Sequence, residues 1–253
     1  MSVSSSDIIV LGSANMPEND SSTSGGAIDT ATKIIFTDIS ATDEVEILSD
    51  DASDTSQTVT IYGRDSGGNI VSEAESLNGT SVVTTTQTFE RILKITLDSA
   101  ASGTVTIRKE SDNAEIATMA AGITTVRRPF YDATAEASGG SSKTFYEKVF
   151  IKNTNGSTDL LSAKIQGTSD PSGKLAFDLE DATNDNNSVS NRLTAPAGSD
   201  MLGSPTFDDS QKTIPGDNLA SGEAIGVWLE LTLAAGTAAA KTTYTLQVTG
   251  TTT

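Results

Sequence analysis

Residues 58–71 of the chain read Thr-Val-Thr-Ile-Tyr-Gly-Arg-Asp-Ser-Gly-Gly-Asn-Ile-Val, a stretch that is typical of a β-hairpin. Val59 and Ile61 alternate with threonines, so both apolar side chains lie on one face of an extended strand. The polar and glycine-rich residues 65–69 provide a turn, and Ile70 begins a returning strand. The stretch therefore predicts antiparallel β-structure.

Short runs of the same kind recur along the whole chain, and in the first half they are spaced by about 8–12 residues, as in β-sandwiches. The runs lie at residues 32–37, 44–48, 58–62, 91–97 and 104–108, and later at 145–152, 163–166, 174–179, 224–233 and 242–249. Residues 114–121 fit either a strand or a turn or two of helix. The pattern predicts an all-β protein.

The order of these runs predicts two β-sandwich-like domains, of immunoglobulin-like or jelly-roll type, preceded by an extended N-terminal arm. We expect the arm at residues 1–27, because residues 16–26 are polar and rich in turn-forming residues. Gly122 and Pro129 interrupt the pattern, which predicts domains at residues 28–122 and 123–253. The polar stretch 180–217 is expected to be a long loop region suited to contacts.

The composition excludes several kinds of chemistry. The 253 residues include no cysteine and no histidine, so disulfides, Cys/His zinc sites, thiolate nucleophiles and a Ser-His-Asp triad are all ruled out. Carboxylate chemistry is still compatible with the composition, but no paired-carboxylate site is evident. We therefore expect no enzyme activity and no cofactor.

The formal net charge is −18, from 34 acidic and 16 basic residues. Binding to nucleic acid or to an anionic membrane requires the opposite sign, so neither partner is expected. No signal peptide and no membrane-spanning segment is predicted, because the apolar runs are short. An acidic surface would complement a basic patch on a protein partner.

The acidic loops are the places in the sequence where a metal ion could bind. Asp181, Asn184 and Asp185 come closest to an irregular calcium loop, but they lack the spacing of an EF-hand. Solvated loop charge is the favoured interpretation, so no metal is predicted.

Two segments are candidates for a partner interface. Ile8, Ile9, Val10, Leu11 and Met16 supply apolar anchors near the N-terminus, although residues 8–11 also fit the first strand of a domain. Arg127 and Arg128 are adjacent basic residues in an acidic chain, and they fit either an inter-chain anchor or a linker docked on its own domain. Trp228 lies in the middle of an apolar run and is predicted to be a core residue.

The sequence resembles the virion structural proteins of tailed bacteriophages, and most of all their capsid decoration, or cement, proteins. The stretches that carry the resemblance are residues 58–70, 77–80, 88–94, 128–131, 146–153 and 225–229. The resemblance implies a protein, often a homotrimer, on the outside of a capsid, where it bridges major-capsid subunits and stabilises the shell. The alternatives are a tail or head–tail component, and a β-sandwich surface adhesin or carbohydrate-binding module.

Overall fold

The structure is a computed structural model that describes residues 2–17, 19–34, 37–131, 141–236 and 242–252. It is all-β, as the sequence predicts, and its only helical elements in the described parts are the short 3-10 turns η1 (Ser5–Asp7) and η3 (Pro215–Asp217). Within those same parts, no helix is long and apolar enough to cross a membrane.

The chain forms two compact units, and one is inserted into the other. Unit 1 consists of residues 1–29 and 132–253, and unit 2 consists of Thr30–Tyr131. The chain therefore begins in unit 1, builds unit 2, and then returns to complete unit 1. The formal charge is −11 in unit 1 and −7 in unit 2, so the acidity is shared between both.

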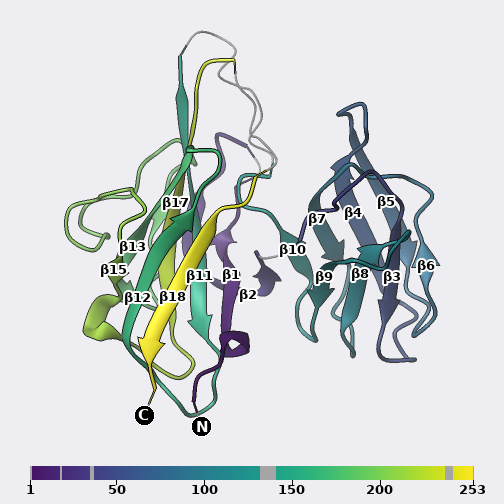
Figure 1. Cartoon of the computed structure of the whole chain (residues 1–253), viewed down its shortest axis with the longest axis horizontal. Coiled ribbons are helices and arrows are strands. Elements are labelled where there is room, and N and C mark those ends of the chain that lie inside the picture. The colour runs from purple at the N-terminus through teal and green to yellow at the C-terminus, as the bar shows by residue number, and fades with distance from the viewer. Residues whose placement is uncertain (1, 18, 35–36, 132–140, 237–241, 253) are drawn as a thin grey trace. The chain divides into compact units, whose positions relative to one another are not determined.

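Unit 2 is a sandwich of two sheets (Figure 1). The first sheet has the order β10-β7-β4-β5, and the end of β2 pairs in parallel with β10; the second has the order β6-β3-β8-β9. The strands are β2 (Ser24–Lys33), β3 (Val45–Ser49), β4 (Thr58–Arg64), β5 (Ile70–Ser76), β6 (Val83–Thr84), β7 (Arg91–Leu97), β8 (Val105–Lys109), β9 (Glu115–Met119) and β10 (Thr125–Arg127).

Strict alternation of apolar and polar residues builds the core of unit 2. In β3, β4 and β8 every second residue is buried, and Val59, Ile61 and Ile107 are fully enclosed. The predicted hairpin at residues 58–71 is confirmed: β4 pairs antiparallel with β5, from Thr58 opposite Ser76 to Arg64 opposite Ile70. Residues 114–121 contribute the strand β9, not a helical turn.

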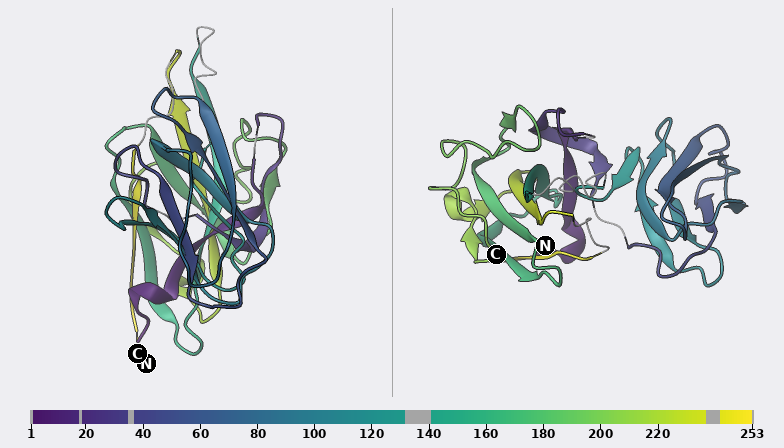
Figure 2. Two further views of the ribbon diagram at one scale, coloured as in Figure 1. Left: turned by 90° about the vertical axis from the view of Figure 1, so that its right-hand side faces the viewer. Right: turned by 90° about the horizontal axis from the view of Figure 1, so that it is seen from above.

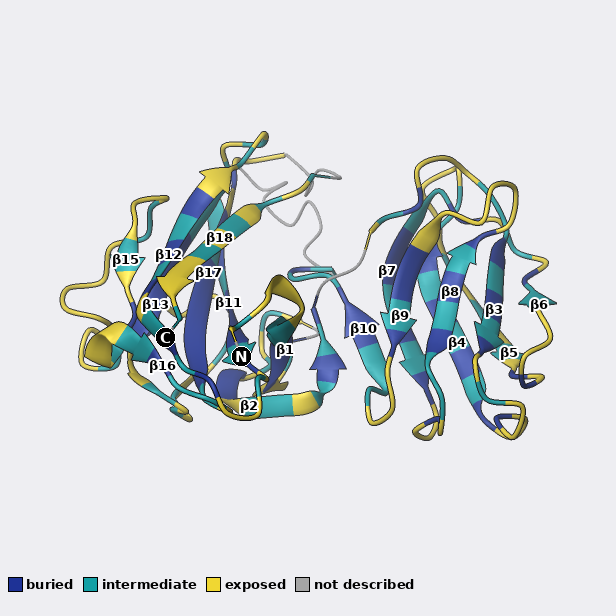
Figure 3. Ribbon diagram, turned by 60° about the horizontal axis from the view of Figure 1, so that its bottom comes forward, coloured by how far each residue is buried: buried dark blue, intermediate teal, exposed yellow. Residues whose placement is uncertain are grey.

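Unit 1 is also built from two sheets, and its larger sheet contains most of its buried residues (Figure 3). That sheet has the order β13-β17-β11-β1-β2, with β14 paired to β2, and the smaller sheet pairs β12 with β15, β16 and β18. The strands are β1 (Ile8–Asn15), β11 (Lys143–Asn153), β12 (Leu160–Ser169), β13 (Leu175–Thr183), β14 (Ser188–Val189), β15 (Lys212–Thr213), β16 (Asn218–Leu219), β17 (Ala224–Leu233) and β18 (Thr245–Thr251).

Strand β17 is the second strand of the large sheet of unit 1, counted from the β13 edge, and is buried along most of its length. It pairs with β11 on one side and with β13 on the other. Residues two apart in a strand share a face, so Val227, Leu229 and Leu231 are on one face and Trp228 is on the other. Trp228 packs against Val189 and Met201 of the segment that follows β13, so this segment covers the second face of the sheet.

The predicted N-terminal arm is wrong. Residues 8–15 form β1, which pairs antiparallel with β11 from Ile8 opposite Asn153 to Gly12 opposite Val149. The physical reason is the apolar run 8–11, which gains more from completing this sheet than it would in an arm exposed to water. Just before β1, the carbonyl of Asp7 accepts a hydrogen bond from the amide of Thr154, 2.7 Å away. The start of β1 and the end of β18, which pairs with Leu161, therefore lie at the same end of unit 1 (Figure 2).

The domain boundaries also differ from the predicted ones. Unit 2 ends at Tyr131 and not at residue 122, because β10 follows Gly122 and pairs with β7. The central residue of β10, Val126, is fully buried in the core of unit 2. The other difference is that residues 1–29 belong with the C-terminal part of the chain. Sequence order alone does not reveal such an insertion.

Candidate functional site

The most unusual group of side chains lies inside unit 1, on the face of the large sheet that carries Trp228. Lys148 of β11 is the register partner of Trp228 in β17. Its side chain is completely buried, as is that of Glu180 in β13, and the side chain of Asp185 is 5% exposed. We call the group formed by Lys148, Glu180, Asp185, Asn187 and Trp228 the buried lysine cluster.

The side chains of this cluster contact one another directly. The Nζ of Lys148 lies 3.0 Å from Oε1 of Glu180 and is in contact with Oδ1 of Asp185. Both oxygens of Glu180 accept further hydrogen bonds. Oε1 accepts from the indole nitrogen of Trp228 at 2.6 Å, and Oε2 accepts from the side-chain amide nitrogen of Asn187 at 2.9 Å. The cluster is thus held by three strands or loops that are distant in sequence.

The aromatic surroundings separate the amine of Lys148 from water. Its Nζ lies 4.9 Å from the ring centre of Phe150 and 5.8 Å from that of Trp228. Gly226, two residues before Trp228, leaves the space in which the charged side chains meet. A Cβ atom at Gly226 would be 2.6 Å from Oδ2 of Asp185 and 2.7 Å from both Cγ of Glu180 and Cε of Lys148.

The charges of the cluster do not balance when all three groups are ionised, because two carboxylates face one ammonium. Burial raises the pKa of Glu180 above its usual value, although the hydrogen bond from Asn187 and the charge of Lys148 oppose this effect. A second sign of imbalance is Oδ2 of Asp185, which is buried and has no hydrogen-bond partner among the described residues.

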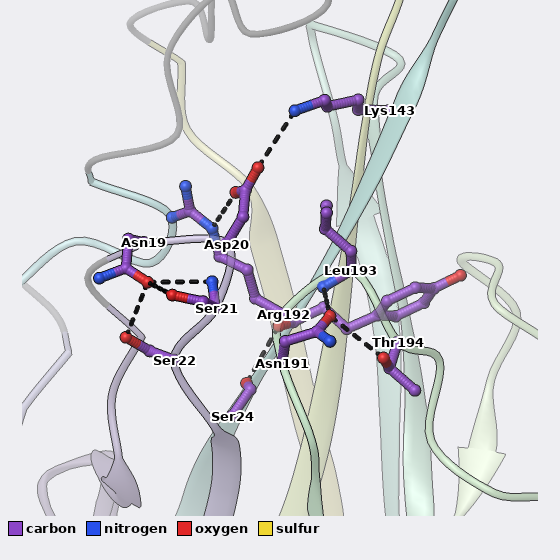
Figure 4. A network of polar contacts seen from close by, with 11 residues as sticks. Asn19, Asp20, Ser21, Ser22, Ser24, Lys143, Asn191, Arg192, Leu193 and Thr194 are labelled. Carbon is purple, nitrogen blue, oxygen red and sulfur yellow. Dashed lines mark hydrogen bonds and ion pairs between the residues drawn. The ribbon is translucent and has the colours of Figure 1, made fainter.

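A second, partly buried network of polar side chains ties the N-terminal segment to the rest of unit 1 (Figure 4). Asp20 accepts a hydrogen bond from Nε of Arg192 at 3.0 Å and another from Nζ of Lys143 at 3.1 Å. Arg192 is only 1% exposed, and its guanidinium lies 4.9 Å from the ring centre of Phe145. Ser24 donates to the carbonyl of Tyr146. These bonds are a further reason why residues 16–26 do not form a free arm.

The predicted interface residues divide into buried and half-buried groups. Leu11 and Arg127 are each 2% exposed, so both are used inside their own units. Arg128 is half-buried and pairs with Asp38, 3.1 Å from Nη1 to Oδ2; burial lowers its pKa. Both arginines lie in unit 2, so this segment is docked on its own unit. A contact of Arg128 with a partner stays a prediction. Ile8, Ile9, Val10 and Met16 are partly exposed, and their contact with a partner stays a prediction.

The three residues that come closest to a calcium loop in the sequence do not converge in the structure. Asp181 is exposed, Asn184 accepts a hydrogen bond from the backbone amide of Ala224, and Asp185 turns into the buried lysine cluster. Within the described ranges, no group of three or more acidic, histidine or cysteine side chains could hold a metal ion.

The sequence predicts Lys148 only as a strand residue and places Glu180 at the start of the polar loop region 180–217, so the buried lysine cluster is not predicted. One signal was available. Lys148 is flanked by Phe145, Val149 and Phe150, and Glu180 follows Phe177 and Leu179, so both charges interrupt strands that are otherwise strongly apolar. Charged residues are rarely buried without a partner, and two such interruptions of opposite sign suggest an internal pair.

Comparisons with known proteins give no relative. No protein-family model matches the chain, and no curated protein and no solved structure is detectably similar to it.

Proposed function

We propose that the chain is a non-enzymatic structural protein of a virion, which binds the outside of a phage capsid and bridges major-capsid subunits. The observation that carries this proposal is that some charged side chains are buried inside the fold while the chain keeps a large negative net charge. Buried charged side chains such as Lys148, Glu180 and Arg192 stabilise unit 1 from within, while the chain as a whole keeps a net charge of −18. Such a molecule is suited to lasting attachment to a basic surface.

The exposed edge of unit 2 supports a docking role. β5 is the last strand of its sheet, and its residues alternate between exposed and half-buried. Ile70, at the start of β5, is 72% exposed, which is the highest value among the large apolar side chains of the described residues. An edge strand can add to the sheet of a partner, and Ile70 would supply an apolar anchor beside it.

Unit 1 offers a separate edge for a second contact. β18 pairs with β12, and most of its residues are exposed or half-buried. A bridging protein needs at least two contact surfaces, and each unit supplies one. The half-buried residues Ile8, Ile9, Val10, Met16 and Arg128 would then act by supporting these surfaces or lining the contact between subunits of a trimer.

The experiment is co-sedimentation of the purified chain with capsids assembled from the major capsid protein of the same phage. We expect saturable binding, a raised melting temperature of the capsid, and a trimer by light scattering. Ile70→Asp is expected to weaken binding by about tenfold or more if Ile70 is a central contact. Leu193→Asp is the matched control, because Leu193 is a partly exposed apolar residue of unit 1 (39% exposed).

Other outcomes would favour other functions. A chain that is monomeric and ignores capsids contradicts the proposal. Rings of sixfold symmetry would indicate a tail or head–tail component. Glycan binding together with a calcium-dependent rise in melting temperature would indicate an adhesin or a carbohydrate-binding module.

A further inference from the structure

The buried lysine cluster has the composition and the geometry of a covalent cross-linking site. Two ionised carboxylates beside one buried ammonium leave one negative charge uncompensated, and burying ions costs more free energy than their attraction regains unless their geometry and hydrogen bonding are excellent. Here one amine meets two carboxyl groups, and one oxygen of Asp185 has no partner among the described residues. The arrangement needs a different explanation.

We propose that the side chains of Lys148 and Asp185 are joined by an isopeptide bond, and that the chain forms this bond itself with Glu180 as the proton carrier. The proposal concerns a modification inside unit 1. It is independent of whether the protein binds a capsid.

The reaction is a condensation that releases one water molecule. The neutral amine of Lys148 attacks Cγ of Asp185, the Nζ–Cγ bond forms, and the bond from Cγ to one carboxyl oxygen breaks. Starting from the ion pair, the ammonium of Lys148 loses two protons and keeps one. The two protons combine with the departing oxygen of Asp185 and leave as water. One positive and one negative charge disappear, no electrons are transferred, and no other reactant is required.

Each group around the reacting atoms has a defined part. Glu180 lies 3.0 Å from Nζ, so it can take a proton from the amine and deliver it to the departing oxygen. The raised pKa of Glu180 suits this exchange. The backbone amide of Asn187 donates to Oδ1 of Asp185 at 3.0 Å and would polarise this carbonyl as charge develops on it. The unbonded Oδ2 is the oxygen free to leave.

The packing favours both the reaction and its product. Three strands or loops hold the amine and the acid in contact before any bond forms, which removes most of the entropic barrier. Gly226 leaves the room for this approach. Phe150 and Trp228 keep water from the site, so hydrolysis of the amide is disfavoured. The amide is also neutral, which removes two charges from the interior.

Two other lysine ion pairs among the described residues have a carboxylate partner that is more open to water, and they provide internal controls. Lys212 contacts Asp208 at 2.8 Å, but the side chain of Asp208 is 42% exposed. The buried Asp178 is farther from the amine of Lys212, at 3.7 Å. Lys109 contacts Asp112 at 2.9 Å, and Asp112 is 52% exposed. Water stabilises both pairs in the ionised form, and a charged ammonium is not a nucleophile. We expect neither pair to be cross-linked.

The test is tryptic mapping of the denatured full-length protein by mass spectrometry. Trypsin does not cleave after a lysine whose amine is acylated. The expected product is therefore residues 144–152 covalently attached to residues 175–192, lighter than the sum of the two peptides by one water. Cleavage after Lys109 and Lys212 is expected to be normal. Free peptides 144–148, 149–152 and 175–192, with no linked species, would overturn the proposal.

Two variants separate the roles within the cluster. Lys148→Arg removes the nucleophile, so its intact mass is expected to differ from the wild type by the substitution plus one water. Glu180→Gln keeps both reacting groups and an oxygen that can accept from Trp228, and it is expected to lose the cross-link and regain cleavage after Lys148. Circular dichroism checks that this variant is folded. A fully linked Glu180→Gln protein would contradict the role assigned to Glu180.

Discussion

Gly226 is the residue on which the packing of the buried lysine cluster depends, because Lys148, Glu180 and Asp185 all approach the position that its Cβ would occupy. Gly226→Ala is therefore expected to destabilise unit 1 by about 1–3 kcal/mol, as other overpacked cores do. The measurement is urea unfolding. Gly156→Ala is the matched control, since Gly156 is exposed and a Cβ there meets no atom within 4 Å. Equal loss of stability in both variants would contradict the argument.

Asp208 is expected to make stability sensitive to acid. Its hydrogen bond from Lys212, helped by Ser210, lowers its pKa from 3.8 to about 2. The folded state therefore binds this proton less readily than the unfolded state. The stabilising contribution is complete above pH 4 and is lost as the pH falls towards 2.

The measurement for Asp208 is urea unfolding at a series of pH values. The variant Asp208→Asn should be less stable than the wild type at pH 6 and should lose less stability between pH 4 and pH 2. Asp217→Asn removes one exposed carboxylate and controls for net charge. Parallel curves for the wild type and Asp208→Asn would show that the pair with Lys212 has no such effect.

The sequence predicted the burial of single residues well where the residue type is usually found in one place, either in the core or at the surface. Trp228 was expected in the core and is fully buried, and Phe145 is buried while its neighbour Tyr146 is only partly so. Lys148 was missed for the same reason. A lysine in a strand usually points to water, and only its partners Glu180 and Asp185, more than 30 residues away in sequence, make burial tolerable.

At the scale of elements, the strands are largely predictable and their partners are not. The alternation of apolar residues is a local property, and it predicted β3, β4, β7, β8 and β17 close to their observed bounds. The pairing of β1 with β11 joins residues that are far apart in sequence, such as Ile8 and Asn153. No local pattern indicates this partner, and the polar residues that follow β1 favoured an arm instead.

The place of β1 in the sheet leads to a prediction that an arm would not. Leu11 is 2% exposed, so Leu11→Ala is expected to cost about 2–5 kcal/mol, through lost apolar burial and the cavity left behind. Ile70→Ala is the matched control at an exposed apolar position and should change stability by less than about 0.5 kcal/mol. Urea unfolding followed by circular dichroism measures both. An unaffected Leu11→Ala variant would restore the arm as the better description.

At the scale of the whole molecule, the insertion of unit 2 into unit 1 separates two cores within one chain. Unit 2 has a continuous cluster of buried apolar residues from both of its sheets, and both units are all-β. The sequence predicted two β-sandwich-like domains, but it placed residues 1–27 outside both. The sequence did not reveal that strands from the N-terminal and C-terminal parts of the chain pair in one sheet, because such pairing depends on residues that are far apart in sequence.

Two separate cores also allow the cross-link to be tested through stability, because it would hold only unit 1. An isopeptide bond between Lys148 and Asp185 closes a loop that persists in the unfolded chain. By analogy with disulfides, a loop of this length contributes about 3–4 kcal/mol. We therefore expect Glu180→Gln to lower the unfolding midpoint of unit 1 and leave that of unit 2 unchanged.

The single tryptophan makes this measurement specific. Trp228 lies in unit 1, so its fluorescence follows the unfolding of unit 1 alone, whereas circular dichroism follows both units. Loss of hydrogen bonds in Glu180→Gln would also lower the midpoint, but only loss of the cross-link lets the unfolded chain expand and so raises the slope of stability against urea concentration. A lower midpoint with an unchanged slope would mean that Glu180 stabilises unit 1 through its contacts and not through a covalent bond.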